Sequence, residues 1–479
     1  MGEVILYNRT REKKFEVVMA GKELKRFCTV TVFLLLAAAF MMGSPRQIAE
    51  GMKTIILCRD ALITDYFEMA NYGAAFFNVA LLAAIVLMLL CKGKVPFTGI
   101  TMAVFFINIG YGFWGKNPVN IAPVLLGTWL YAKFSRAPMS RYIYTALFGT
   151  CLSPLVTEMM HILPFDTRIN LLCAVFIGIL VGFILPPLSV HTASMHAGYN
   201  LFNVGFSGGI IAFVLVCILK AVGIESATVF IWKEGRHPGI LVGIYLYFGL
   251  TILYGLWIAT GKYRRKMENT EGLIVQEKTA CSLWQAVRAA GRDLLRITRH
   301  RGRAVTDFIL MDGAGVTLMN MGLMGITGAT YIVLTGGDLS GPVLGTVFTA
   351  FGFSAFGAHL KNYLPVLLGV YLLTFVTQYT PATPGLQLAA LFAVGLSPIA
   401  GQFGILVGMA AGALHSCIVM CTASMYGGLN LYNNGFSAGW VAITIVPIAE
   451  SFISHFELRR NAVKGKKQQE KDKSRKQKK

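Results

Sequence analysis

Apolar segments recur along most of the chain, separated by short polar breaks that often contain glycine or proline. They run from Phe27 to Ile453, and most are about 17 to 25 residues long. An α-helix needs this length to cross about 30 Å of hydrocarbon. Because lipid offers no partner for backbone N–H and C=O groups, the pattern predicts an all-α polytopic integral membrane protein with about fourteen spans.

A second regularity is an internal repeat. The segment TASMHAGYNLFNVGFSGGIIA at 192–212 returns as TASMYGGLNLYNNGFSAGWVA at 422–442, and NIAPVLLG at 120–127 returns as NYLPVLLG at 362–369. Glycine and proline at matching positions are hard to attribute to shared hydrophobicity, since they are the residues least replaceable at turns and close contacts. The chain therefore contains a duplicated membrane domain.

The charge of the loops indicates how the two copies are oriented. In the first copy the loops CKGK at 91–94 and AKFSRAPMSR at 132–141 are basic. The corresponding loops of the second copy, TGGDL at 335–339 and QYTPATPG at 378–385, contain neither lysine nor arginine. Since basic loops stay in the cytoplasm, we expect two inverted structural repeats, and we expect broken or re-entrant helices within them.

These patterns divide the chain into six segments. We expect an N-terminal segment with a leading transmembrane helix (1–64), a first membrane repeat (65–223), an extra transmembrane helix (224–261), a basic cytoplasmic linker (262–304), a second, inverted repeat (305–456) and a basic disordered tail (457–479). Within the linker, Ser282 and Gln285 have the spacing of a capping box, which predicts an amphipathic helix lying on the membrane surface.

Composition supports a membrane location. The chain is 55% hydrophobic and 14% charged, and its mean hydropathy is +0.60. The formal net charge of +20 is concentrated in the N-terminal segment, the linker and the tail. Basic segments that flank membrane spans face the cytoplasm and attract anionic lipid. We expect a multi-pass protein of the cell inner (plasma) membrane with both termini cytoplasmic, with membrane lipid and not nucleic acid as a partner.

Polar residues inside apolar segments are candidates for a substrate pathway, because each costs free energy unless it is paired or hydrated. Four sets recur in both copies: Ser153 and Pro154 with Ser397 and Pro398; Glu158 with Gln402; Asn200, Asn203 and Ser207 with Asn430, Asn433 and Ser437; and Asn78 with Asn320. In one hypothesis they form half-helix ends near the midplane, where dipoles and side chains replace a solute's hydration shell. In the other they hold helices together.

Two acidic residues leave alternatives open. Glu158 has a neutral counterpart in the second copy, so it either couples transport to protons or lies at the outer membrane interface. Asp312, near the start of the second copy, has the same two interpretations.

The sequence contains neither a recognisable metal-binding pattern nor a familiar enzyme motif. His191, His196, His415 and Cys421 lie close to the duplicated segments, but their spacings fit no familiar ligand pattern. No HExxH, Walker, GxSxG or kinase signature is present. We therefore expect no catalytic residue, no metal and no cofactor, and a protein that is not an enzyme.

With its NPVNIAPVLLG segment at 117–127, its two Leu-Ser-Pro breaks and its paired TASM segments, the chain resembles an uncharacterised bacterial multi-pass membrane family, catalogued as a domain of unknown function. The order of motifs within each copy distantly resembles the urea transporters, with Gly-Tyr-Asn at 198–200 and Gly-Leu-Asn at 428–430. That resemblance implies a channel-like architecture with inverted halves, re-entrant half-helices and homo-oligomeric assembly.

The function we predict is a membrane channel or facilitator for a small polar solute, which passes at the interface of the two repeats. One alternative is a proton- or cation-coupled secondary transporter with Glu158 as the coupling acid. A second is a membrane-embedded metal or redox enzyme that uses His191, His196, His415 and Cys421. A third is a receptor or scaffold for lipid or partner proteins.

Overall fold

A computed structural model describes residues 2–226, 228–270 and 282–476. The first half contains α1 (Gly2–Met42), α2 (Pro45–Leu57), α3 (Tyr66–Met69), α4 (Tyr72–Lys92), α5 (Gly99–Tyr111), α6 (Ile121–Phe134), η1 (Met139–Arg141), α7 (Ile143–Gly149), η2 (Thr150–Leu152), α8 (Ser153–Ile162), α9 (Thr167–Met195) and α10 (Asn203–Ala221). The second contains α11 (Pro238–Thr270), α12 (Leu283–Ile297), α13 (Phe308–Met311), α14 (Ala314–Leu334), α15 (Gly341–Phe353), α16 (Leu360–Leu373), α17 (Pro384–Phe392), η3 (Ala393–Leu396), α18 (Ser397–Phe403), α19 (Ile405–Met425) and α20 (Asn433–Lys476). The predicted all-α polytopic membrane fold is confirmed, since nine helices among the described residues are long and apolar enough to cross a membrane.

The two halves repeat the same order of elements. Helices α1 to α10 correspond to α11 to α20, and the short turn η2 before α8 has its counterpart in η3 before α18. The packing corresponds as well: α1 lies against α4 as α11 lies against α14, and α6 lies against α9 as α16 lies against α19. The structural repeat therefore includes α1 and α11, which lie outside the two repeats that the sequence comparison defined.

A pseudo-two-fold axis relates the halves, because contacts between them occur in reciprocal pairs. The Nδ2 atom of Asn200 donates to the carbonyl of Gly435 at 3.0 Å, and the Nδ2 atom of Asn430 donates to the carbonyl of Gly205 at 3.2 Å. Each asparagine therefore satisfies a backbone carbonyl on a helix of the other repeat. The duplicated segment that contains them forms part of the interface between the repeats.

Two aspartates form a second reciprocal pair of contacts. Asp307 accepts a hydrogen bond from the backbone N–H of Gly99 at 2.8 Å, and Asp65 accepts one from the N–H of Gly341 at 3.1 Å. Gly99 and Gly341 are the first residues of α5 and α15. Each carboxylate therefore satisfies a backbone donor at the start of the other repeat's short central helix, where negative charge is favourable.

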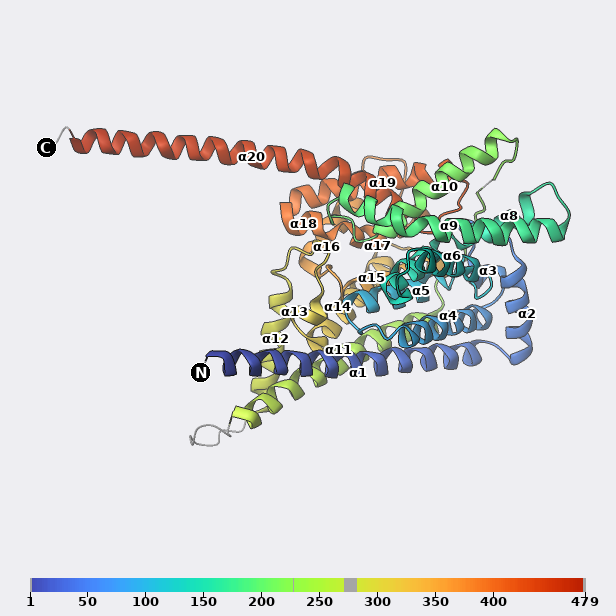
Figure 1. The fold of residues 1–479 in the computed structure, drawn as a ribbon, viewed down its shortest axis with the longest axis horizontal. Helices are drawn as coiled ribbons and strands as arrows, with labels where there is room; N and C mark the ends of the chain where they lie inside the picture. The colour runs from blue at the N-terminus through green and yellow to red at the C-terminus, as the bar shows by residue number, and fades with distance from the viewer. Residues whose placement is uncertain (1, 227, 271–281, 477–479) are drawn as a thin grey trace.

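Helices α5 and α15 lie side by side at the centre and run antiparallel. A Cβ atom on Gly110 would overlap the carbonyl of Gly345, and one on Gly99 would overlap the carbonyl of Ala355, so the start of α5 meets the end of α15. Figure 1 shows α2 and α8 at one end of the molecule and their counterparts α12 and α18 at the other. The two repeats are inverted relative to each other, as predicted.

The central helices are too short to cross a membrane alone. Helix α5 has 13 residues, as does α15, which gives a length of about 20 Å against the roughly 30 Å of hydrocarbon. Helices α6 and α16 have 14 residues each. The loops at 112–120 and 354–359 thus separate the two short helices of each repeat. Broken or re-entrant helices are present as expected, but these interruptions lie away from the Leu-Ser-Pro segments where the sequence placed them. These four short helices also explain why the full-length spans are fewer than the about fourteen expected.

The linker forms the predicted amphipathic helix at α12. Ser282 and Gln285 make a capping box, in which the backbone N–H of Gln285 donates to the Ser282 hydroxyl at 3.2 Å. Ala286 and Ala290 are buried, and α12 packs against α11 and α14. Trp284 lies on the exposed face. The helix therefore rests on the second repeat and presents an aromatic side chain outward.

The C-terminal segment differs from its prediction in one respect. Helix α20 continues to Lys476, through most of the segment that we expected to be disordered. Lysine, glutamine, glutamate and arginine dominate this segment and all have good helix propensity, so an apolar helix can extend into it without a break. Residues 477–479 of the predicted tail and 271–281 of the predicted linker lie outside the described residues.

Candidate functional site

The loop that breaks the first central helix contains a buried lysine, Lys116. Its side chain has no exposed surface. The Nδ2 atom of Asn78 donates to the carbonyls of Lys116 and Gly112, both at 2.7 Å, so α4 holds both ends of the loop. Asn320 holds the corresponding loop of the second repeat in the same way. The duplicated asparagines at these two positions therefore anchor the loops of the broken helices.

The ammonium group of Lys116 lies among neutral oxygens and aromatic rings. Its Nζ atom is 2.7 Å from Thr150 Oγ1, 3.1 Å from the Tyr432 hydroxyl and 3.2 Å from Asn108 Oδ1. It also lies 4.9 Å from the ring centre of Tyr432 and 5.3 Å from that of Tyr111. Tyr432 belongs to the second repeat and the other residues to the first. The site is therefore assembled at the interface of the repeats.

Other hydrogen bonds fix the direction of two of these oxygens. The Nδ2 atom of Asn108 donates to the carbonyls of Val104 at 2.8 Å and Leu147 at 3.2 Å, so its amide oxygen faces Lys116. The single hydrogen of the Thr150 hydroxyl has two acceptors in reach, the carbonyl of Leu147 at 2.8 Å and Asn108 Oδ1 at 3.0 Å, and with either of them its lone pairs remain for the lysine. Both oxygens are thus oriented as acceptors for Nζ.

No carboxylate lies within ion-pair distance of Lys116 in the part of the chain that the structure describes. Asn108 is in the last turn of α5, and Thr150 follows the last residue of α7. The negative ends of two helix dipoles therefore lie near the lysine and offset part of its charge. A buried ionisable group without a counter-ion is expensive within a membrane and points to a functional site.

The six equivalent positions around the loop of the second repeat all carry apolar side chains. Asn108, Tyr111, Trp114, Lys116, Thr150 and Tyr432, which we call the Lys116 cluster, are replaced there by Ala350, Phe353, Phe356, Ala358, Val394 and Phe202. Phe202 and Phe353 contact each other at 4.7 Å between ring centres, much as Tyr432 and Tyr111 do at 4.5 Å. The fold thus forms this packing without any of the polar atoms, and their presence in the first repeat requires another explanation.

A buried carboxylate, Asp60, supports the Lys116 loop from the side. It accepts hydrogen bonds from the Tyr66 hydroxyl at 2.7 Å, from Asn120 Nδ2 at 3.0 Å and from Asn117 Nδ2 at 3.4 Å. Burial raises the pKa of Asp60 to about 6, although hydrogen bonds from donors such as Tyr66 and Asn120 partly oppose the shift. Gly302 takes its place in the second repeat, so this support also belongs to the first repeat alone.

Glu158 forms an ion pair at the same end of the molecule. Its side chain is fully buried and receives two hydrogen bonds of 2.5 Å from Arg59 and one of 2.8 Å from the Ser226 hydroxyl. In the second repeat Arg301 donates to the neutral Gln402 at 3.0 Å. The two positions therefore keep the same arginine contact, and the negative charge is found in the first repeat only.

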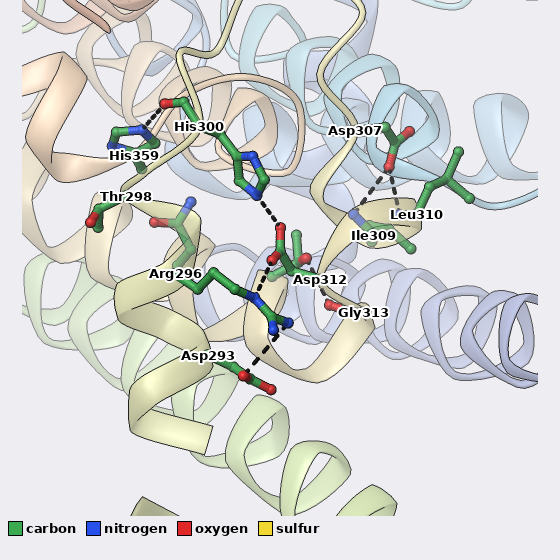
Figure 2. Close-up of polar contacts among 12 residues, drawn as sticks. Asp293, Arg296, Thr298, His300, Asp307, Ile309, Leu310, Asp312, Gly313 and His359 are labelled. Carbon is green, nitrogen blue, oxygen red and sulfur yellow. Dashed lines mark hydrogen bonds and ion pairs between the residues drawn. The ribbon is translucent and has the colours of Figure 1, made fainter. Parts of the chain in front are cut away.

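Asp312 lies in a second charged cluster, between α12 and α13. Figure 2 shows its carboxylate between His300 and Arg296. One carboxylate oxygen lies 2.8 Å from His300 Nε2, and the other lies 3.3 Å from Arg296 Nε. His359 Nε2 lies 2.9 Å from the carbonyl of His300. The cluster thus ties the amphipathic helix α12 to the start of the second repeat.

The remaining duplicated side chains lie at contacts between helices. The Oδ1 atom of Asn203 accepts from the Thr192 hydroxyl at 2.9 Å, and that of Asn433 accepts from the Thr422 hydroxyl at 2.7 Å. Ser207 and Ser437 join the same threonines at 2.7 and 3.0 Å. Together with Asn200 and Asn430, these side chains use their hydrogen bonds on neighbouring helices, which matches the interhelical contacts weighed from the sequence.

The Ser-Pro pairs mark the starts of two helices. Pro154 and Pro398 occupy the first turns of α8 and α18, directly after the 3-10 turns η2 and η3. The Ser153 hydroxyl donates to the carbonyl of Gly115 at 3.1 Å, next to Lys116. The Ser397 hydroxyl is buried and has no hydrogen-bond partner among the described residues. Ser153 therefore contributes to the Lys116 loop, and Ser397 makes no matching bond.

The histidines and the cysteine considered as metal ligands are spread over several contacts. His196 Nε2 lies 2.9 Å from Asn203 Oδ1, and His415 Nε2 lies 3.1 Å from Asn434 Oδ1. Cys421 is exposed, as is His191. Over the described ranges, no three His, Cys, Asp or Glu side chains gather in a way that could hold a metal ion.

A family model described as protein of unknown function (DUF1576) matches residues 44–221 and 287–451, well over half of the chain. The chain belongs to this family. The two matched segments of this DUF1576 protein begin at α2 and within its counterpart α12, so they follow the structural repeat. Curated proteins and solved structures gave no match, and the resemblance to urea transporters stays a prediction.

Lys116 is not among the site residues predicted from the sequence of this DUF1576 protein. The available signal was a lysine between the apolar segments of α5 and α6, in Gly-Lys-Asn-Pro at 115–118, where the matching segment of the second repeat reads Gly-Ala-His-Leu at 357–360. A comparison that looks for polar residues shared by both repeats passes over this position, because its partner is Ala358. Differences between the copies would have revealed it.

Proposed function

We propose that this DUF1576 protein carries a small polar solute across a membrane at the interface of its inverted repeats. The Lys116 cluster is the observation that carries the proposal. Inverted-repeat transport proteins bind their substrates near the midplane, where broken helices meet. Here a broken helix supplies a buried ionisable side chain, and a tyrosine of the other repeat completes the cluster. A shift of one repeat against the other would therefore change the site.

The proposal includes an orientation in the plasma membrane with both termini in the cytoplasm. Lys92 ends α4 and Lys133 lies in the last turn of α6, and basic residues at these ends favour the cytoplasmic side. In this orientation the Lys116 loop would lie in the outer half of the membrane and Ala358 in the inner half. A solute would then meet a polar site on one side and an apolar one on the other.

A coupled transporter is a second candidate, and Lys116 favours it more than Glu158 does. Glu158 is already paired with Arg59 and hydrogen-bonded to Ser226, which holds its charge in place. Lys116 has no counter-ion within the described chain, so gain or loss of a proton there would change the charge of the site most. A facilitator and a coupled transporter share the same location for the solute.

The test is flux in proteoliposomes that contain the full-length protein. Stopped-flow light scattering would follow a panel of small solutes, namely urea, glycerol, acetamide, formate and acetate. Wild type would be compared with Lys116→Ala, which copies the second repeat, and with Lys361→Ala, an exposed lysine on α16. We expect a solute-specific phase in wild type and Lys361→Ala that Lys116→Ala loses or slows by at least about tenfold, as the loss of one charged contact predicts.

Two results would count against the proposal. Flux equal to that of protein-free vesicles for every solute, also under an imposed proton gradient, would remove the transport function. Unchanged flux in a folded Lys116→Ala variant would leave transport in place and move the pathway away from this cluster.

A further inference from the structure

We propose that the Lys116 cluster binds a small anion together with a proton, so that the transported solute is a small carboxylate or a similar anion. This inference rests on the transport function proposed above. Its starting point is the hydrogen bonding of Lys116 Nζ, whose three partners are the oxygens of Asn108, Thr150 and Tyr432.

The neutral amine form of Lys116 satisfies every polar atom in this group. An amine has two hydrogens and one lone pair, while Asn108 Oδ1 and Thr150 Oγ1 are both oriented as acceptors. The Tyr432 hydroxyl has no other hydrogen-bond partner among the described residues, so it can donate to the lone pair at 3.1 Å. In this form Lys116 and its three partners carry no net charge, and each of their donors has an acceptor.

Protonation of Lys116 creates two unmet requirements at once. An ammonium group has three hydrogens and no lone pair, so the Tyr432 hydroxyl loses its acceptor. The new positive charge also has no carboxylate nearby, and a buried charge without a partner is strongly unfavourable. An anion beside Nζ supplies both the counter-charge and the acceptor for Tyr432. Uptake of one proton from solution and uptake of one anion therefore favour each other.

A further donor lies beside this group. Tyr432, Tyr111 and Trp114 follow one another as a stack, with ring centres 4.5 and 4.9 Å apart. The Nε1 atom of Trp114 is buried and has no acceptor among the described residues. The second repeat has Phe356 in place of this tryptophan and hence no such donor. Two donors of the cluster thus lack an acceptor when Lys116 is charged.

The charge of the site depends on Lys116 alone. The titratable groups that face it are the hydroxyl of Tyr111 from α5, the thiol of Cys151 from η2 and the hydroxyl of Tyr432 from the loop before α20. All three are neutral in their ordinary acid forms. Asp60 is hydrogen-bonded to Asn117 and Asn120 and forms no ion pair with Lys116 in the described chain. The proton and the anion therefore meet at one lysine.

The test uses purified full-length protein in detergent, with thermal unfolding as the readout. Sodium formate, sodium acetate and sodium phosphate would be titrated at pH 6 and pH 8 against sodium gluconate of equal ionic strength. We expect at least one of the three small anions to raise the unfolding temperature. Its half-maximal concentration should be lower at pH 6, by up to about tenfold per pH unit, as expected when one proton binds with the anion. Formate and acetate against phosphate separate carboxylates from inorganic anions.

Variants decide whether Lys116 is responsible. Lys116→Ala and the more conservative Lys116→Met should lose the anion response, and Tyr432→Phe should raise the half-maximal concentration by at least about tenfold, since it removes a hydrogen bond to a charged group. Lys361→Ala should respond like wild type. In weakly buffered solution, wild type should take up about one proton per bound anion. Folded Lys116 variants that respond like wild type, or a wild type that ignores all three anions, would overturn the inference.

The flux assay separates this inference from the transport proposal beneath it. Flux of urea or glycerol without any anion response would overturn the anion site and leave transport standing. An anion response that depends on Lys116, without flux of any solute, would overturn transport and leave a ligand-binding membrane protein.

Discussion

Replacement of Arg59 by leucine is expected to destabilise the protein much more than replacement of Glu158 by glutamine, although each change breaks the same ion pair. The reason is the unequal burial of the two side chains. That of Glu158 is fully buried, while that of Arg59 is 34% exposed. After loss of the arginine, the Ser226 hydroxyl at 2.8 Å is the main donor left to a carboxylate that water cannot reach.

The magnitudes follow from this difference. Removal of one partner from a buried ion pair leaves an uncompensated charge and costs about 3 to 5 kcal/mol. Glu158→Gln keeps the shape of the side chain and one acceptor for Arg59, whose charge reaches water through its exposed part. The second repeat already contains this neutral arrangement, with Arg301 bonded to Gln402 at 3.0 Å. We therefore expect Glu158→Gln to cost about 1 kcal/mol, the value of an ordinary hydrogen bond.

The measurement is unfolding of the purified protein in mixed micelles, followed by circular dichroism as denaturing detergent is added. Arg301→Leu is the matched control, because its partner Gln402 is neutral, and its loss should stay near about 1 kcal/mol. Equal losses for Arg59→Leu and Glu158→Gln would refute the reasoning from burial. A large loss for Arg301→Leu would show that packing of the arginine, and not the charge of its partner, decides the outcome.

Three further predictions use the same unfolding assay. Gly345→Ala should abolish folding or cost at least about 3 kcal/mol, because its Cβ atom would overlap the carbonyl of Gly110. The control is Gly249→Ala on α11, which has open space around it and should be neutral or slightly stabilising. Asp312→Asn should release α12 from the second repeat and speed its limited proteolysis, at a cost of about 1 to 3 kcal/mol. The stabilising contribution of Asp60 should be fully present below about pH 4 and lost as pH rises through its folded pKa of about 6. Asp60→Asn should therefore make the free energy of unfolding less dependent on pH between about pH 4 and 6. An unchanged slope in this variant would show that other groups cause the pH dependence.

The fold was largely predictable, because the residues that the two repeats share are those that close packing requires. Gly99 and Gly341 sit where a Cβ atom would overlap a backbone carbonyl of the other repeat, and Asn200 and Asn430 bond across the interface, so both copies kept them. The equivalence of α1 and α11 could not be found this way. Their packing needs an apolar surface of the right length, which many sequences supply, and no residue had to stay in register.

The site was less predictable, because its polar residues occur at only one of two equivalent places. Residues that both repeats share, such as Asn203 and Asn433, are the ones that an inverted scaffold needs in order to hold its helices together. Lys116 and Asp60 have no polar counterpart in the second repeat, so a search for duplicated polar residues leaves them out. In a duplicated protein the shared polar residues report on architecture first, and the unshared ones are the better guide to chemistry.

The sequence difference between the two broken helices also makes the two sides of the molecule unequal. A perfectly symmetric pair of inverted repeats would present the same half-saturation concentration to a solute on either face of the membrane. With Lys116 on one side and Ala358 on the other, the two faces are chemically different. For a passive carrier, thermodynamics requires the ratio of maximal rate to half-saturation concentration to be equal in both directions, but each quantity is free to differ. Kinetic asymmetry of this kind would arise because the side chains of the two repeats differ, although their backbones are nearly symmetric.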